Sequence, residues 1–248
     1  MSSVNFQLPF AVLLAGALAV ALGLLSALWL ERASEKTKLY APSLLAGGLL
    51  LLCFYDYFGY IDWVFSSHYG SEQGGGICLV LFLLGGFLSS ETGEAIIWRR
   101  FKKLGSVGEK RHYAALVCAV CAFCAYSFVV GIQLTTSAGA YISAVFASAF
   151  IEVLIFSLCC FCGLSVLSLS KHSLFTFVAF FALSRAVGAT LAMILSEHVI
   201  NEMLLTSLGA AACGALLCGA VKLISGSRQS LTFCMFGFAG MLLVKLIE

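Results

Sequence analysis

Long apolar segments are the feature that most constrains this chain. A helix that crosses a bilayer needs roughly 20 predominantly apolar residues, and segments of that length follow one another along almost the whole sequence. Apolar residues make up 61% of the 248 residues and charged residues only 10%, whereas soluble domains are about half apolar and about a quarter charged. This composition excludes a soluble globular enzyme and a disordered chain. The sequence therefore predicts an all-helical integral membrane protein.

We predict eight transmembrane helices that are joined by short loops into a single domain over residues 1–248. Strands of a membrane barrel are excluded, because they would alternate in hydropathy over about ten residues. The first apolar segment has no basic leader and exceeds the core of a signal peptide, so we expect a retained helix. The predicted spans are 8–30, 39–61, 77–98, 113–134, 141–166, 173–195, 202–224 and 230–247.

The Lys and Arg residues fall almost entirely in alternate loops, which sets the predicted orientation. Basic loops face the cytoplasm, and here they are the 1–2, 3–4, 5–6 and 7–8 connections. Residues 99–112 form the most basic of them, a short cytoplasmic loop between the third and fourth spans. Because the span count is even, both termini should be non-cytoplasmic. The net charge of +2 is small and dispersed, so we expect no nucleic-acid partner.

Two opposite charges lie near the middle of the predicted membrane. Glu152 is in the fifth span and Arg185 is in the sixth. A charge at the centre of a bilayer costs roughly 3 kcal/mol on insertion scales, so we predict that these two residues pair. The pair either orients two helices or belongs to a transport pathway, and the sequence leaves both readings open.

Two further carboxylates lie near the inner end of the third span. Glu91 and Glu94 are one helical turn apart, so they share a face of the helix. They either guide cations or form a solvated helix end beside Arg99 and Arg100.

Asp56 lies in the outer third of the second span. It is followed by Tyr57, Tyr60 and Trp63, and such aromatic residues are typical of the membrane interface. We expect Asp56 to line an outer vestibule or to extend its carboxylate into the interface.

Eleven cysteines occur in the chain, none in an evident water-exposed loop, which argues against a disulfide framework. Thiolates favour soft metals, so six thiols on the fourth and fifth spans could form a metal site together with Glu152. The alternative is that these cysteines are small apolar packing residues. No histidine, the commonest metal ligand, lies between residues 113 and 171. The six residues are Cys118, Cys121, Cys124, Cys159, Cys160 and Cys162.

Small residues inside the spans mark expected helix contacts. In membranes, such residues let two helix backbones approach closely. We expect contacts of this kind at Gly47–Gly48, Gly85–Gly86, Gly209 and Gly214. No nucleophile elbow, phosphate loop or HExxH motif is present, so we do not expect an enzyme.

Several short strings along the spans carry a family resemblance. They are AGGLLLLCFYDYFGYID at 46–62, Gly86–Phe87 followed by Glu94, SFVVG at 127–131, RAVG at 185–188 and ACGA at 212–215. In this order, on eight predicted spans with a cytoplasmic 3–4 loop, they resemble the ZIP family of divalent-metal transporters. The resemblance touches most of the chain, but each motif is short. It implies a ZIP-like helical bundle and inward movement of a metal cation.

The departures from that family concern its metal centre. The resemblance implies a metal site between the fourth and fifth helices, made of histidines and carboxylates. Tyr126 and Val130 stand where the family has the histidine and glutamate of the fourth helix, and Phe150 lies near the position of the fifth-helix histidine. Glu152 is the carboxylate that remains there, and Arg185 brings a positive charge close to it. We therefore expect the usual metal centre to be largely replaced.

Three functions follow from these observations. The first is a ZIP-like transporter that moves divalent metal cations, zinc foremost, toward the cytoplasm. The alternative is a non-transporting relative that acts as a regulatory or partner subunit in a membrane complex. The third is a transporter or channel for another solute. The pathway candidates are Asp56, Glu91, Glu94, Tyr126, Ser127, Glu152 and Arg185.

The expected partners are the lipid bilayer, a metal cation as transported substrate rather than resident cofactor, and either a second copy of the chain or a membrane partner. The expected location is the plasma membrane or an endomembrane.

Overall fold

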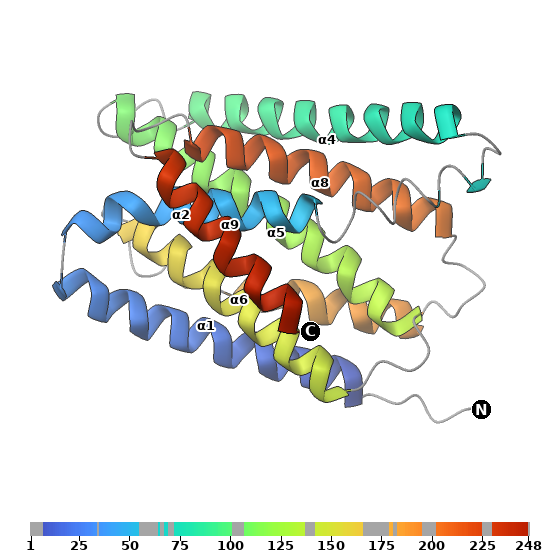
Figure 1. Cartoon of the computed structure of the whole chain (residues 1–248), viewed down its shortest axis with the longest axis horizontal. Coiled ribbons are helices and arrows are strands. Elements are labelled where there is room, and N and C mark those ends of the chain that lie inside the picture. Colours follow the sequence, from blue (N-terminus) through green and yellow to red (C-terminus); the bar gives the residue numbers. More distant parts are fainter. Residues whose placement is uncertain are drawn as a thin grey trace.

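The structure is a computed structural model, and the residues it describes are helical (Figure 1). These residues are 7–33, 35–54, 64, 67–68, 72–100, 107–136, 142–165, 179–180, 183–194, 202–224 and 230–247. The helices follow the apolar segments of the sequence, because a continuous apolar helix satisfies its own backbone hydrogen bonds inside a membrane.

The helix bounds agree closely with most of the predicted spans. The last two, α8 and α9, begin and end at the predicted residues, while α4 and α5 extend beyond the predicted ends. Because α4 continues to Arg100 and α5 begins at Val107, both ends of the predicted loop 99–112 are helical. The helices are α1 (Gln7–Ala33), α2 (Glu35–Leu52), α4 (Glu72–Arg100), α5 (Val107–Thr136), α6 (Ile142–Ser165), α8 (Glu202–Ile224) and α9 (Ser230–Ile247), with the shorter apolar helix Leu183–Ile194 between α6 and α8.

Among the described residues, 4 helical segments are long and apolar enough to cross a membrane. They lie in α1, α4, α5 and α8, and shorter apolar segments occur in α2, in α6 and at Leu183–Ile194. The chain is therefore a helical protein with several helices suited to a membrane. The count of eight spans and the orientation of the termini stay predictions, and the outer part of the predicted second span lies outside the described residues.

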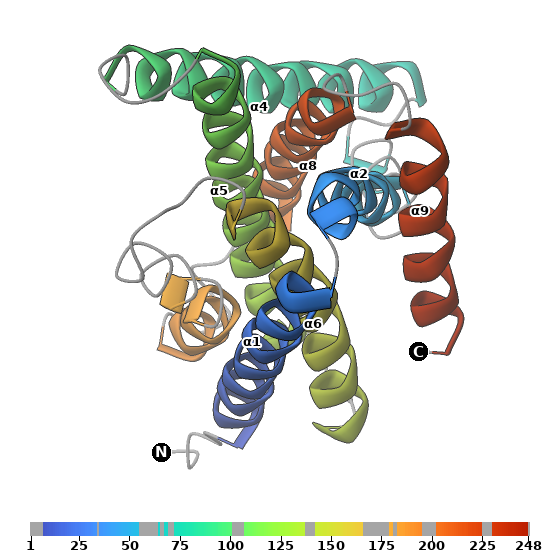
Figure 2. The same ribbon diagram turned by 90° about the vertical axis from the view of Figure 1, so that its left-hand side faces the viewer.

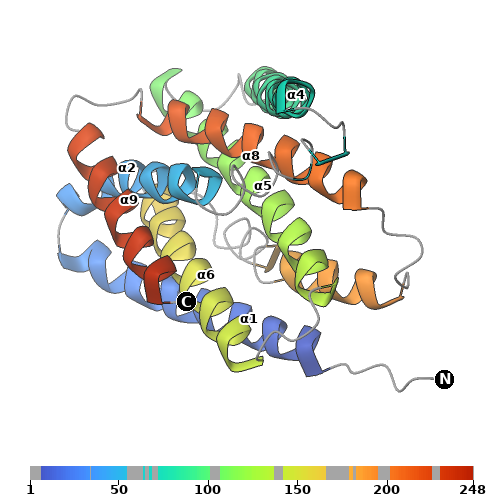
Figure 3. The same ribbon diagram turned by 45° about the vertical axis from the view of Figure 1, so that its right-hand side comes forward.

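The helices pack in parallel pairs around a central group of four. In Figure 1, α1 runs alongside α6 and α4 alongside α8, while α9 crosses α2 obliquely, and in each pair the colours progress toward the same side. Figures 2 and 3 show α4 and α9 at the outside of the bundle. The central group, α2, α5, α6 and α8, is joined by contacts of α2 with α6 and α8 and of α5 with α6 and α8.

Glycines form the crossing points of these pairs. Where α4 crosses α8, a Cβ atom on Gly86 would collide with the Ala211 carbonyl oxygen, and one on Gly214 would collide with the Leu83 carbonyl oxygen. This reciprocal contact brings the two backbones together, as small residues do in membrane helix pairs. The expected packing role of Gly86 and Gly214 is confirmed, whereas for Gly48 and Gly85 it is wrong, because a Cβ added to either of them would have no atom within 4 Å.

The same reciprocal contact recurs at two other crossings. Gly47 and Gly237 join α2 to α9, and Gly131 and Gly188 join α5 to helix Leu183–Ile194. At the fourth crossing, between α1 and α6, one glycine is replaced by Ser157, which packs on Gly23. Small residues therefore set how closely each pair of helices approaches.

The main contacts fall into two matching halves. Each helix of one half has a counterpart in the other half: helix Leu183–Ile194 for α1, α8 for α2, α9 for α4 and α6 for α5. When every helix is replaced by its counterpart, each main pair of contacting helices becomes another pair that is also in contact. In membrane proteins built from such repeats, functional sites lie near the midplane where the halves meet. Here α5 and α6 are counterparts of each other in the two halves, and they are in contact. The seam between α5 and α6 therefore lies where the two halves of the bundle meet.

Candidate functional site

The centre of the bundle holds the predicted ion pair. Arg185 of helix Leu183–Ile194 donates from Nη2 to Oε2 of Glu152 on α6. Their side chains are only 3% and 2% exposed, so the two charges neutralise each other away from solvent. The prediction that Glu152 and Arg185 pair is confirmed.

Two tight crossings hold the pair in place. The contact of Gly131 with Gly188 brings the backbone of Arg185 against α5. On the other side, Ser157 lies five residues after Glu152 on α6, and its hydroxyl donates to the Ala19 carbonyl oxygen of α1 at 3.4 Å. Because both helices are anchored through backbone contacts, the carboxylate and the guanidinium meet with little freedom to move apart.

Aromatic side chains close the seam beside the pair. Phe156, one helical turn after Glu152 on α6, stacks on Phe123 of α5 with ring centroids 3.8 Å apart and an interplanar angle of 13°. Tyr126 packs against Phe123 at a centroid distance of 5.9 Å. All three aromatic side chains are buried, so the middle of the seam is filled by aromatic rings.

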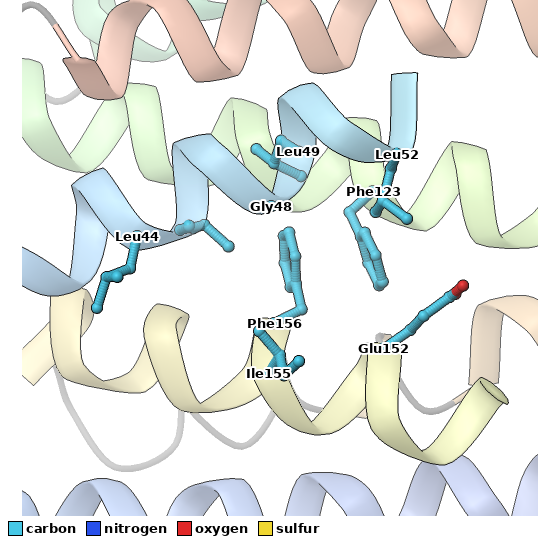
Figure 4. A pocket seen from close by; sticks show the side chains of 9 residues that line it. Leu44, Gly48, Leu49, Leu52, Phe123, Glu152, Ile155 and Phe156 are labelled. Atoms are coloured by element: carbon cyan, nitrogen blue, oxygen red, sulfur yellow. The ribbon is translucent and has the colours of Figure 1, made fainter. Parts of the chain in front are cut away.

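A small pocket between α2, α5 and α6 borders these rings. Figure 4 shows the rings of Phe123 and Phe156 side by side below α2, with Glu152 next to them. Apart from Glu152, the lining is glycine, leucine, isoleucine and phenylalanine. A Cβ added to Gly48 would have no atom within 4 Å, so open space adjoins this glycine. A cation in the pocket would meet one carboxylate and otherwise carbon atoms.

The two other central candidates, on α5, are buried. Tyr126 is 1% exposed and belongs to the apolar core. Ser127 is fully buried, and within the described parts of the chain its hydroxyl has no hydrogen-bond partner.

A second charged cluster lies at the predicted inner end of the bundle. Lys222 of α8 forms ion pairs with both predicted carboxylates of α4, at 2.9 Å from Glu91 Oε2 and in direct contact with Glu94 Oε2. The side chains of Lys222, Glu91 and Glu94 are 18%, 44% and 13% exposed. The thiol of Cys218 lies 4.0 Å from Glu91 Oε1. Both carboxylates thus share a single lysine, and the three side chains together keep one net negative charge.

The three cysteines of α5 do not converge. Cys118 donates to the Ser90 carbonyl oxygen of α4 at 3.8 Å, Cys121 is exposed, and Cys124 is half-buried. The described residues contain no group of three or more His, Cys, Asp or Glu side chains that could hold a metal ion. The side chains of Cys159, Cys160 and Cys162, and all of Asp56, lie outside the described residues.

Three residues of these sites escaped the sequence reasoning. The contact of Lys222 with Glu91 and Glu94 was open to prediction, because the predicted topology places the inner ends of the third and seventh spans on the same side of the membrane. The sequence gives no sign that Phe123 and Phe156 stack, because a phenylalanine inside an apolar span looks like any other core or lipid-facing residue.

Comparison of the chain with protein-family models and with curated proteins finds no match. The chemistry of the central pair therefore has to be read from its own residues.

Proposed function

We propose that this chain is a non-transporting membrane protein of ZIP-like plan, which acts as a regulatory or partner subunit in a membrane complex. The observation that carries the proposal is the buried ion pair between Glu152 and Arg185. In it, a protein cation occupies the electrostatic place that the family resemblance assigns to a transported metal.

The chemistry of arginine supports this assignment. A zinc site needs nitrogen, sulfur or oxygen donors at about 2 Å from the ion, whereas a guanidinium offers only hydrogen-bond donors and stays charged. A metal ion that approached Glu152 would have to displace Arg185. Breaking a buried pair in this way costs about 3–5 kcal/mol, because it leaves an uncompensated charge.

The surroundings of the two acidic sites point the same way. Among the described residues, the lining of the pocket beside Glu152 includes no second polar side chain, and its walls are apolar. At the inner end, Lys222 forms ion pairs with both Glu91 and Glu94, so one positive charge offsets one of the two negative charges. Among the described candidates, Glu91, Glu94 and Glu152 each have a basic partner from another helix.

A second candidate is ZIP-like transport of divalent metal cations, zinc foremost, toward the cytoplasm. It is favoured by the position of Glu152, which lines a pocket at the seam where the two halves of the bundle meet. In this function, Arg185 would hold the carboxylate in the empty protein and release it when a cation arrives.

Metal uptake into liposomes that contain the purified full-length chain separates the two candidates. We expect no saturable uptake of Zn²⁺, Fe²⁺, Mn²⁺ or Cu⁺ by the wild-type protein. Saturable uptake that is lost in the double variant Glu152→Gln/Arg185→Met, but kept in Glu94→Gln, would overturn the proposal and establish transport through the central site. The double variant removes the charges as a pair, so loss of uptake would not simply report an unfolded protein.

A further inference from the structure

The seam between α5 and α6 contains a barrier that does not depend on charge. Phe123 and Phe156 reach across it from opposite helices and stack face to face at 3.8 Å. Neither side chain is exposed by more than 3%. The stack lies one helical turn from Glu152, on the side toward the C-terminal end of α6.

A small pocket at Gly48 of α2 borders this barrier. It is lined by Phe123, Phe156 and Glu152 among others, and a Cβ added to Gly48 would have no atom within 4 Å. The rings are therefore packed between helices α5 and α6 but border a void toward α2. Truncating both rings would enlarge the void and extend it along the seam.

We propose that Phe123 and Phe156 form an aromatic plug that seals a latent path through the middle of the bundle against water and small ions. The plug goes beyond the proposed function, because it closes the path by excluding water, whereas Arg185 only neutralises a carboxylate. Apolar constrictions of this kind block ions by dewetting.

The position of the plug supports a path rather than an ordinary core contact. The rings come from α5 and α6, which are counterparts of each other in the two halves of the bundle. In membrane transporters built from repeats, the substrate sites lie where such halves meet. A core contact elsewhere, such as that of Phe146 with Phe150 within α6, joins neighbours on one helix and closes no seam.

The test is a flux measurement on the full chain in liposomes that hold a pH-sensitive dye, with a potassium gradient and valinomycin to drive protons inward. We expect the wild type to leave the liposomes tight. The double variant Phe123→Ala/Phe156→Ala should raise the proton flux several-fold. The matched control Phe146→Ala removes a half-buried phenylalanine from the same helix, away from the pocket, and should leave the flux at the wild-type level.

A third variant tests the role of the void. Adding Gly48→Leu to the double alanine variant should suppress the leak, because the new side chain extends into the open space next to the missing rings. Phe156→Leu alone keeps most of the packed volume and removes the stack, so it provides a folded variant with a smaller leak if the double variant does not fold.

The proposal of a plug would be overturned if the double variant elutes and melts as a folded protein and its liposomes show no proton leak. Folded Phe156→Leu protein without a leak would overturn it too. An equal leak in Phe146→Ala would overturn it as well. These outcomes are independent of metal uptake by the wild type, which bears only on the proposed function.

Discussion

The two charged sites of this protein use the same chemistry in different surroundings. At the centre, Glu152 and Arg185 are almost completely buried. At the end of the bundle that we predict to be the inner one, Lys222 pairs with Glu91 and Glu94, and Glu91 is 44% exposed; we call these three residues the inner cluster. Both sites join two helices through carboxylate and basic side chains: the central pair joins α6 to helix Leu183–Ile194, which follows it in the chain, and the other site joins α4 to α8.

The difference in burial decides what each site contributes. A buried charge that loses its partner keeps the full cost of its desolvation, whereas exposed ion pairs are worth only about 0–1 kcal/mol because water and salt screen them. We therefore expect changes to the central pair to lower the stability of the fold strongly, and changes to the inner cluster to lower it only slightly. Four predictions sharpen this contrast.

The largest effect should follow from Glu152→Gln. It leaves Arg185 buried without its carboxylate, and a guanidinium cannot lose its proton to become neutral. We expect a loss of roughly 3–5 kcal/mol in stability, seen as a strongly reduced yield of folded protein and a lower melting temperature in detergent. Wild-type melting of this variant would show that Arg185 is not held by Glu152.

Arg185→Ala should destabilise the protein less than Glu152→Gln. The remaining carboxyl group can take up a proton and bury itself in the neutral form, which limits the cost. Thermal unfolding of both variants under identical conditions checks the order. The double variant Glu152→Gln/Arg185→Met is the control, because removing both charges of a buried pair is often nearly neutral. A double variant as unstable as Glu152→Gln would contradict an ionic origin of the effect.

Lys222→Met should cost at most about 1 kcal/mol, since its partners are partly solvated. The effect should also shrink at high salt, because ions screen exposed charges over a Debye length of about 8–10 Å at moderate ionic strength. Melting curves at low and high salt measure this. If Lys222→Met lowered the stability as much as Arg185→Ala does, and by the same amount at low and high salt, the two sites would not differ in the way proposed.

The smallest effects should separate the two carboxylates of the inner cluster. Glu94 is 13% exposed and Glu91 is 44% exposed, so Glu94→Gln should lower the melting temperature more than Glu91→Gln. Each change should remain within about 1 kcal/mol. The reverse order would indicate that Glu91, not Glu94, is the main partner of Lys222.

Part of the central site was predictable because charge is rare in the membrane. Glu152 and Arg185 stand out in apolar spans, and opposite charges at the same depth have a strong reason to meet. The cysteines show the limit of this reasoning. Cys118, Cys121 and Cys124 share one side of a helix by spacing, yet Cys118 bonds to α4, Cys121 is exposed and Cys124 is half-buried. Spacing along a helix gives direction but not the identity of the neighbour.

The sequence by itself determined the helical, membrane-type character of the chain, most of the helix bounds and the pairing of two buried charges. These depend on segment length, on hydropathy and on the cost of an unpaired charge, which are properties of a single segment or of two rare residues. Only the tertiary structure decided that Lys222 reaches Glu91 and Glu94, that Phe123 stacks on Phe156, and which glycines meet at each crossing. Such contacts depend on which helices become neighbours, and a lipid environment offers every apolar helix much the same surroundings.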